Sequence, residues 1–156
     1  MRWTNPPNYD KIRLMKQLEK RYEQFPHTAD IGVRAYGRDL KELFANAAFG
    51  MFDIIADLEG LKGEFEQDIG LSAANSEELL ISWLDELLYN FYTKQIIFFK
   101  FDVKEISGTM IKARVYGRQV GSNRNRLKTE IKAATYSDLA IKKTPDGYSV
   151  EIIFDI

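Results

Sequence analysis

The chain has 156 residues, of which 45% are hydrophobic, 29% charged and 13% aromatic, as in one ordinary globular domain. A formal net charge of −1 gives no overall indication of a nucleic-acid binder, and the absence of cysteine excludes disulfides, thiolate zinc sites and cysteine nucleophiles. No apolar run approaches the ~18 residues of a transmembrane helix, and the first residues lack the apolar centre of a signal peptide, so we expect a cytoplasmic protein.

The predicted elements begin after an N-terminal stretch of different character. Residues 1–20 contain a turn-forming cluster, TNPPN, and a short basic helix pattern, YDKIRLMKQLEK. We interpret them as an N-terminal extension that precedes a single domain spanning residues 21–156. Two short strands, YEQF and IGVRAYG, are predicted next, on either side of the polar stretch PHTAD.

Two amphipathic helices are predicted from apolar residues that recur at i, i+3, i+4 and i+7. The first covers 38–55, with Asp39 as its N-cap, and the second covers 75–95, with Asn75 as its N-cap. Between the two helices, the weak alternation of GEFEQDIGLSA (63–73) predicts a strand.

The last third of the chain is predicted to be entirely β. Its strand segments are IIFFKFDVKEI, TMIKARVYGRQV, TEIKAATY, LAIKKT and YSVEIIFDI, separated by turns at Gly108, at 121–125 and at Asp146-Gly147. Two helices among strands without a βαβ rhythm predict an α+β single domain, in which two main amphipathic helices pack with an antiparallel or mixed β-sheet.

The common catalytic motifs are absent. The sequence has no P-loop, no glycine-rich dinucleotide fingerprint, no HExxH and no nucleophile elbow. Because His27 is the one histidine of the sequence, a single chain cannot form a site from several imidazoles. These absences therefore disfavour an enzyme that acts alone.

Two carboxylates are expected where the last strand ends. The side chain of Asp155 and the main-chain carboxylate of Ile156, the last residue of the sequence, would repel each other unless a cation or a positively charged side chain lay between them. Ca²⁺ and Mg²⁺ favour such all-oxygen sites. The alternative is that Asp155 merely ends a strand in water. Similarly, Asp30 could form an Asx turn, and His27 could be an ordinary loop residue. A metal-binding role for Asp30 therefore requires that Asp30 and Asp155 meet in the fold.

A basic segment lies between Glu105 and Glu130, where no acidic residue occurs. Its cations are Lys112, Arg114, Arg118, Arg124, Arg126 and Lys128. They could contact phosphates or an acidic protein surface. The alternative is a solvated hairpin that is balanced by the acids between Asp53 and Asp68.

Five segments, taken in order, resemble the archease family. They are HTADIG (27–32), LKELFANAA (40–48), WLDELL (83–88), LKTEIKAATY (127–136) and FDI (154–156). Archeases are small α+β proteins that serve as cofactors of the RtcB-class RNA ligase in tRNA splicing and RNA repair. They promote guanylylation of the ligase, its multiple turnover and its use of a wider range of nucleotides. The resemblance therefore implies an activator of such a ligase, which reaches tRNA through the ligase complex, with no role for DNA or membranes.

The resemblance also implies particular site residues. The family's metal-binding aspartate falls on Asp30, and its C-terminal ligands fall on Asp155 and on the carboxylate of Ile156. The functionally important lysine of the family falls on Lys132, which by itself would read as a solubilising residue on the polar face of a strand. The implied cofactor is a divalent metal ion, with Ca²⁺ favoured and Mg²⁺ as the alternative.

Other residues and functions stay open at this point. His27, Arg124 and Arg126 are further candidates for the site, and Ser137 stands where many family members have histidine. Two alternative functions are a direct RNA-binding module that uses the basic residues of 112–128 and a metal-dependent hydrolase that acts alone.

Overall fold

The computed structural model describes residues 21–27 and 29–156, so the helix predicted within 1–20 lies outside the described residues. The elements, in chain order, are β1 (Tyr22–His27), β2 (Asp30–Gly37), α2 (Leu40–Ile55), β3 (Phe65–Ser72), α3 (Ser76–Lys94), β4 (Ile96–Ile106), β5 (Met110–Gln119), the 3₁₀ helix η1 (Gly121–Arg126), β6 (Ala133–Ala134), β7 (Lys142–Thr144) and β8 (Gly147–Asp155). The structure confirms the predicted α+β class, and all pairs between these strands are antiparallel.

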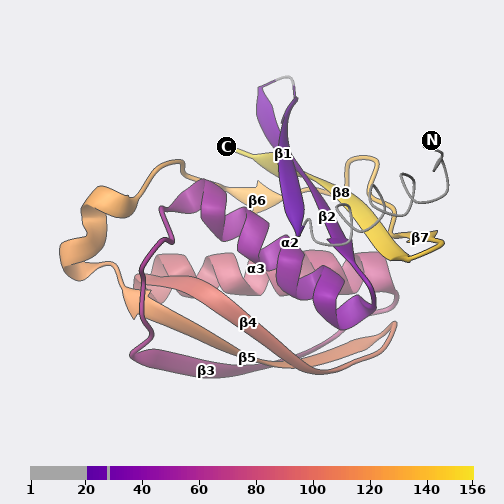
Figure 1. Cartoon of the computed structure of the whole chain (residues 1–156), viewed down its shortest axis with the longest axis horizontal. Coiled ribbons are helices and arrows are strands. Elements are labelled where there is room, and N and C mark those ends of the chain that lie inside the picture. Colours follow the sequence, from indigo (N-terminus) through magenta and orange to yellow (C-terminus); the bar gives the residue numbers. More distant parts are fainter. Residues whose placement is uncertain (1–20, 28) are drawn as a thin grey trace, which may run out of the picture.

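Two sheets enclose the helices (Figure 1). The first sheet has the order β1-β2-β8-β6, with β7 also paired to β8, and the second has the order β3-β5-β4. In Figure 1 the first sheet lies above α2 and α3 and the second lies below them. The first sheet therefore joins the beginning of the domain to its last strand.

The central position of α2 explains its composition. Ten of its sixteen residues are buried, because a helix between two sheets needs apolar residues on more than one side. Its Phe52 packs against Phe91, Phe98 and Phe101 with ring centroids 5.6–6.1 Å apart. The buried Trp83 of α3 donates a hydrogen bond from Nε1 to the carbonyl oxygen of Phe44, at 3.0 Å, and so joins the two helices.

Both predicted helix starts are confirmed. Asp39 accepts a hydrogen bond from the amide of Glu42 at 2.8 Å, and Asn75 accepts one from the amide of Glu78 at 2.9 Å. No helix among the described residues is long and apolar enough to cross a membrane.

Three predictions for the last third were wrong in detail. TEIKAATY is not a strand throughout, since only Ala133–Ala134 pairs, and LAIKKT forms a strand only at Lys142–Thr144. The predicted turn at 121–125 is part of the 3₁₀ helix η1. The physical reason for the first error is that Ile131 is fully buried, while helix side chains hydrogen-bond to the backbone around it. The strand faces predicted for this segment therefore do not apply.

Candidate functional site

A tight hairpin between β1 and β2 positions two of the predicted residues. His27 pairs with Asp30 across the turn, and its Nδ1 lies 3.8 Å from Oδ2 of Asp30. Ala29 has a φ of 61°, in the left-handed region, which lets the chain reverse sharply. Pro26 is tolerated because β1 is an edge strand, where a missing amide hydrogen costs little. The polar stretch is thus a hairpin end that presents Asp30.

Asp30 and Asp155 meet in the fold. Asp30 on β2 is directly opposite Asp155 on β8, and Asp155 is in turn opposite Ala133 on β6. Directly paired residues point to the same face of a sheet, with Cβ atoms roughly 4.5–5.5 Å apart. Val33 and Ala35 are buried toward the helices, so Asp30 belongs to the outer face. The outer end of the first sheet therefore presents two adjacent carboxylates, with His27 beside them.

Lys132 is held next to this pair by its backbone. The amide of Lys132 donates a hydrogen bond to the carbonyl oxygen of Asp155 at 2.7 Å, and its side chain is exposed. Residues 127–136, which we term the Lys132 segment, connect η1 to the first sheet. Their position brings Lys132 to the end of β8, where the two carboxylates also lie.

Helix side chains fix the irregular Lys132 segment. The hydroxyl of Tyr92 donates a hydrogen bond to the carbonyl oxygen of Ile131 at 2.5 Å, and a carboxylate oxygen of Asp85 accepts one from the amide of Ala134 at 3.4 Å. Burial and the nearby Glu130 raise the pKa of Tyr92, so the hydroxyl keeps its proton. These roles of Tyr92 and Asp85 could not be predicted from the sequence, because such contacts join distant parts of the chain.

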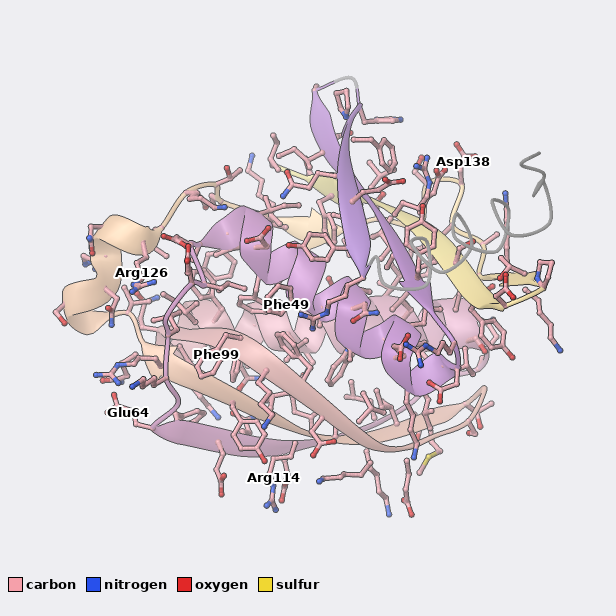
Figure 2. All side chains as sticks on the ribbon, viewed as in Figure 1. Phe49, Glu64, Phe99, Arg114, Arg126 and Asp138 are labelled. Atoms are coloured by element: carbon pink, nitrogen blue, oxygen red, sulfur yellow. The ribbon has the colours of Figure 1, made fainter. Side chains whose placement is uncertain are left out.

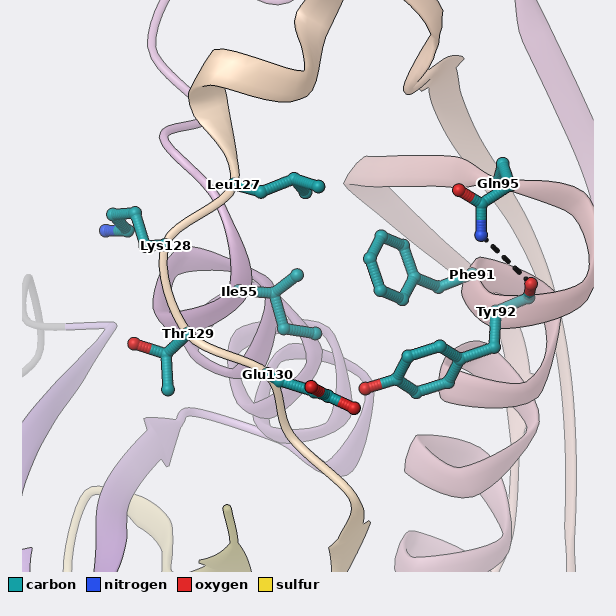
Figure 3. Close-up of a pocket in the computed structure, with 8 residues that line it drawn as sticks. All are labelled: Ile55, Phe91, Tyr92, Gln95, Leu127, Lys128, Thr129 and Glu130. Atoms are coloured by element: carbon teal, nitrogen blue, oxygen red, sulfur yellow. Dashed lines mark hydrogen bonds between the residues drawn. The ribbon is translucent and has the colours of Figure 1, made fainter.

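A cavity of about 390 Å³ lies between the Lys132 segment and the last turns of the two helices (Figure 3). Its apolar wall consists of Ile55, Phe91 and Leu127, while Tyr92 and Glu130 lie at its lower edge in that view. The amide of Lys128 is also hydrogen-bonded to the carbonyl oxygen of Ile55 at 2.7 Å.

The nearby arginine on the outer face does not neutralise the two aspartates. Arg34 is hydrogen-bonded to Glu23 at 2.5 Å and to Glu151, and these bonds raise its pKa above the usual value. Between Arg34 and Asp30, the ring of Phe25 lies over Gly32, where a Cβ would collide with it. Glu23 and Glu151, and not Asp30 or Asp155, therefore balance the charge of Arg34.

The two carboxylates suit a hard divalent cation, but they are only two of the several oxygen ligands that such an ion takes. Carboxylate oxygens such as those of Asp30 and Asp155 are ligands that Ca²⁺ and Mg²⁺ favour. However, no three His, Cys, Asp or Glu side chains in the described part of the chain are arranged to hold a metal. A site with three protein ligands therefore needs a further oxygen, for which the carboxylate of Ile156 is the candidate.

The strand cations of the basic segment are largely paired with acids. Lys112 contacts Glu105 at 3.6 Å, and Arg114 donates to Asp68 at 2.8 and 3.3 Å. Figure 2 shows Arg114 on the outer side of the second sheet and Arg126 near η1. Arg118 and Lys128 lie 3.9 and 4.0 Å from Glu64 and Asp53, respectively. The strand part of the segment therefore resembles the balanced hairpin of the alternative interpretation.

Comparison with known proteins places residues 22–156 in the archease protein family (MTH1598/TM1083). Protein archease of Methanosarcina acetivorans is 43% identical over 146 residues, which cover 91% of this chain and 100% of that protein. Protein archease of Pyrococcus abyssi is 35% identical over 141 residues, covering 88% and 99%.

Solved structures agree with this assignment. The solution structure of protein 1598 from Methanobacterium thermoautotrophicum matches with a TM-score of 0.77 and 32% identity, over 87% of this chain and 99% of that one. A crystal structure from Thermotoga maritima, of a protein named an archease and possible chaperone, shares the fold with a TM-score of 0.57 and 21% identity, over 86% and 96% of the two chains. The family match and the identities together confirm the resemblance seen in the sequence: the chain belongs to the archease family.

Proposed function

We propose that this protein is an activator of an RtcB-class RNA ligase in tRNA splicing and RNA repair, and that it promotes guanylylation and repeated turnover of the ligase. The observation that carries the proposal is the convergence of Asp30, Asp155 and Lys132 at one end of the first sheet. These are the positions that the family resemblance assigns to function. Membership of the archease family supports an accessory role in the cytoplasm, with tRNA contacted through the ligase complex.

The proposed site holds a divalent metal ion, with Ca²⁺ favoured and Mg²⁺ as the alternative. Asp30, Asp155 and the main-chain carboxylate of Ile156 would be its protein ligands. When bound, the ion would supply a positive centre with open positions for phosphate or carboxylate oxygens of the ligase complex.

The chain's own residues prepare this site before any ion binds. Strand pairing places Asp30 opposite Asp155, so little backbone freedom remains to be lost when the two carboxylates converge on one ligand. The exposed Lys132 adds a positive charge at the same end of β8, where it can meet an anionic group of the partner.

Ligase guanylylation, measured with and without this protein, tests the proposal. The original chain is expected to accelerate transfer of the nucleotide to the ligase, and Asp30→Asn, Asp155→Asn and Lys132→Ala are expected to lose most of that acceleration. Glu105→Gln, which removes a carboxylate from the second sheet, is the matched control and should retain it. Circular dichroism would confirm that each variant is folded.

The rival interpretation is an ion that serves stability alone. It predicts that folded Asp30→Asn and Asp155→Asn variants accelerate guanylylation as well as the original chain does, and this result would overturn the proposed role of the site.

A further inference from the structure

A basic hollow lies where η1 approaches the connection between α2 and β3. It has a volume of about 210 Å³, and its polar lining consists of Lys62, Arg118, Ser122, Asn123 and Arg126. The other lining residues are Gly60 and Leu61, so no acidic residue lines it. In Figure 1, η1 is the orange helical turn at the left edge, away from the C-terminal end of β8. The hollow is therefore a different site from the aspartate pair.

Neutral acceptors hold the two arginines in place. Nη1 of Arg126 donates to the carbonyl oxygens of Asp57 at 3.1 Å and Glu59 at 2.6 Å, and Nη1 of Arg118 donates to the carbonyl oxygen of Lys62 at 3.5 Å. A carbonyl oxygen orients a guanidinium but leaves its full positive charge, and its remaining N–H groups stay available as donors. Both arginines are thus positioned in advance without being neutralised by these bonds.

Among residues 21–27 and 29–156, one carboxylate reaches this group of cations at long range. Oε1 of Glu64 is 3.9 Å from Nε of Arg118, and the Glu64 side chain is 57% exposed. Such an exposed contact contributes little and is easily exchanged for another anion. By contrast, Arg114 on β5 has a carboxylate at 2.8 Å. Arg118, at the end of β5, therefore differs from Arg114: its acidic contact is long and exposed, and with Arg126 it belongs to a cluster near η1 whose charge is largely available.

We propose that this hollow binds a phosphate group of an RNA backbone. Arginine, lysine, serine and asparagine are the side chains that most often contact nucleic-acid phosphates, and all four line the hollow. A protein partner would be favoured by aromatic or larger apolar lining, whereas Leu61 is the one large apolar residue here. Arg124 lies on the same helical turn as Ser122, Asn123 and Arg126, is exposed, and adds a further positive charge to η1. The choice of RNA over DNA rests on the proposed function.

The test measures RNA binding by the full chain without any ligase. A negative result would therefore contradict the phosphate site without contradicting the proposed activation of an RNA ligase. The probe is a fluorescein-labelled single-stranded RNA of about 20 nucleotides, followed by anisotropy over a series of salt concentrations. The test variant is Lys62→Ala with Arg124→Ala, which spares the arginines that hold the backbone. The matched control is Lys104→Ala with Lys112→Ala, which removes the same charge from strand residues that have acidic partners.

The test variant is expected to bind the RNA about tenfold more weakly at low salt, and the slope of log affinity against log salt should fall by about 1.4, or 0.7 for each lost phosphate contact. The control should change affinity less than about twofold. Equal losses in both variants would indicate unspecific attraction and overturn the proposal, as would the absence of RNA binding. It would also be overturned if the test variant bound RNA normally but bound the ligase more weakly, because the hollow would then serve an acidic protein surface. Thermal unfolding would confirm that both double variants are folded.

Discussion

Asp30 and Asp155 lie directly opposite each other on the adjacent antiparallel strands β2 and β8, and both point to the outer face of the first sheet. Like charges in this position repel each other, at a cost of roughly 0.2–1 kcal/mol. The repulsion links the stability of the sheet to whatever cation the two carboxylates share.

Asp155→Asn is therefore expected to raise the free energy of unfolding by a few tenths of a kcal/mol in the presence of a chelator, because it removes the repulsion. With Ca²⁺ at about 100 times its dissociation constant, the original chain should gain about 2.7 kcal/mol, and the variant should gain much less. Denaturant unfolding with EDTA or Ca²⁺ measures both effects. An equal gain from Ca²⁺ in the two proteins would show that Asp155 is not a ligand.

The accuracy of the sequence-based predictions depends on how local each signal is. Both helices were predicted because the caps Asp39 and Asn75 and the apolar spacing lie within each element. The Lys132 segment was predicted as a strand because its alternation resembles one, whereas its backbone is held by Tyr92 and Asp85 of a distant helix. Likewise, no local pattern specifies which residue lies opposite Asp30, so family resemblance alone indicated the pairing that the fold shows.

The basic segment illustrates the same limit. The sequence indicated both a cluster of cations and the acids that balance part of it, but not which cations are balanced. Lys62, which lies outside the segment, joins Arg118 and Arg126 at the hollow only because the connection after α2 folds back against η1.

The stability of the fold is expected to fall at alkaline pH, partly through Tyr22. Its hydroxyl donates a hydrogen bond to Asp53 at 2.6 Å, and burial, that bond and the charge of Asp53 raise its pKa above the ordinary value of 10.0. Above about pH 10 the unfolded chain releases this proton while the folded chain retains it, so the free energy of unfolding falls as the pH rises, by at most about 1.4 kcal/mol per pH unit for this group, because solvent screens a half-buried hydroxyl. Below pH 10 the contribution of Tyr22 is fully present.

Tyr22→Phe should therefore unfold with a shallower pH dependence above pH 10, although it loses about 1 kcal/mol at neutral pH with the hydrogen bond. Asp53→Asn should flatten the curve only in part, since burial of Tyr22 remains. Urea unfolding at a series of pH values from 8 upward measures this, and parallel curves for Tyr22→Phe and the original chain would contradict it.

Two glycines in the sheets, Gly147 and Gly70, allow the effect of an added Cβ to be compared at a crowded and at an open position. Gly147, which begins β8, has a φ of 150°, and a Cβ there would collide with the carbonyl oxygen of Gly37 and lie 2.8 Å from Cα of Arg38. Gly70 in β3 has nothing within 4 Å of the same position. Gly147→Ala should lower the free energy of unfolding by more than about 2 kcal/mol, because the obstacle is backbone that cannot turn aside.

Gly70→Ala is expected to be neutral or to stabilise the protein by about 0.4–1 kcal/mol, since alanine restricts the unfolded chain more than glycine does. Thermal or denaturant unfolding of both variants compares them directly. Equal effects at the two positions would indicate that β8 can shift away from Gly37.

Tyr92 is expected to control the Lys132 segment from outside the proposed metal site. Tyr92→Phe removes the hydrogen bond to the carbonyl oxygen of Ile131 and should cost about 0.5–1.5 kcal/mol of stability. Because the amide of the next residue, Lys132, is bonded to Asp155, loosening this anchor should speed hydrogen exchange at Lys132 and lower ligase activation. Tyr89→Phe, the same change at a tyrosine of α3 that is 63% exposed, is the control. The contrary result would be a measurable loss of stability in Tyr92→Phe with unchanged amide hydrogen exchange at Lys132. It would show that pairing with β8 is sufficient to hold the lysine beside the two aspartates.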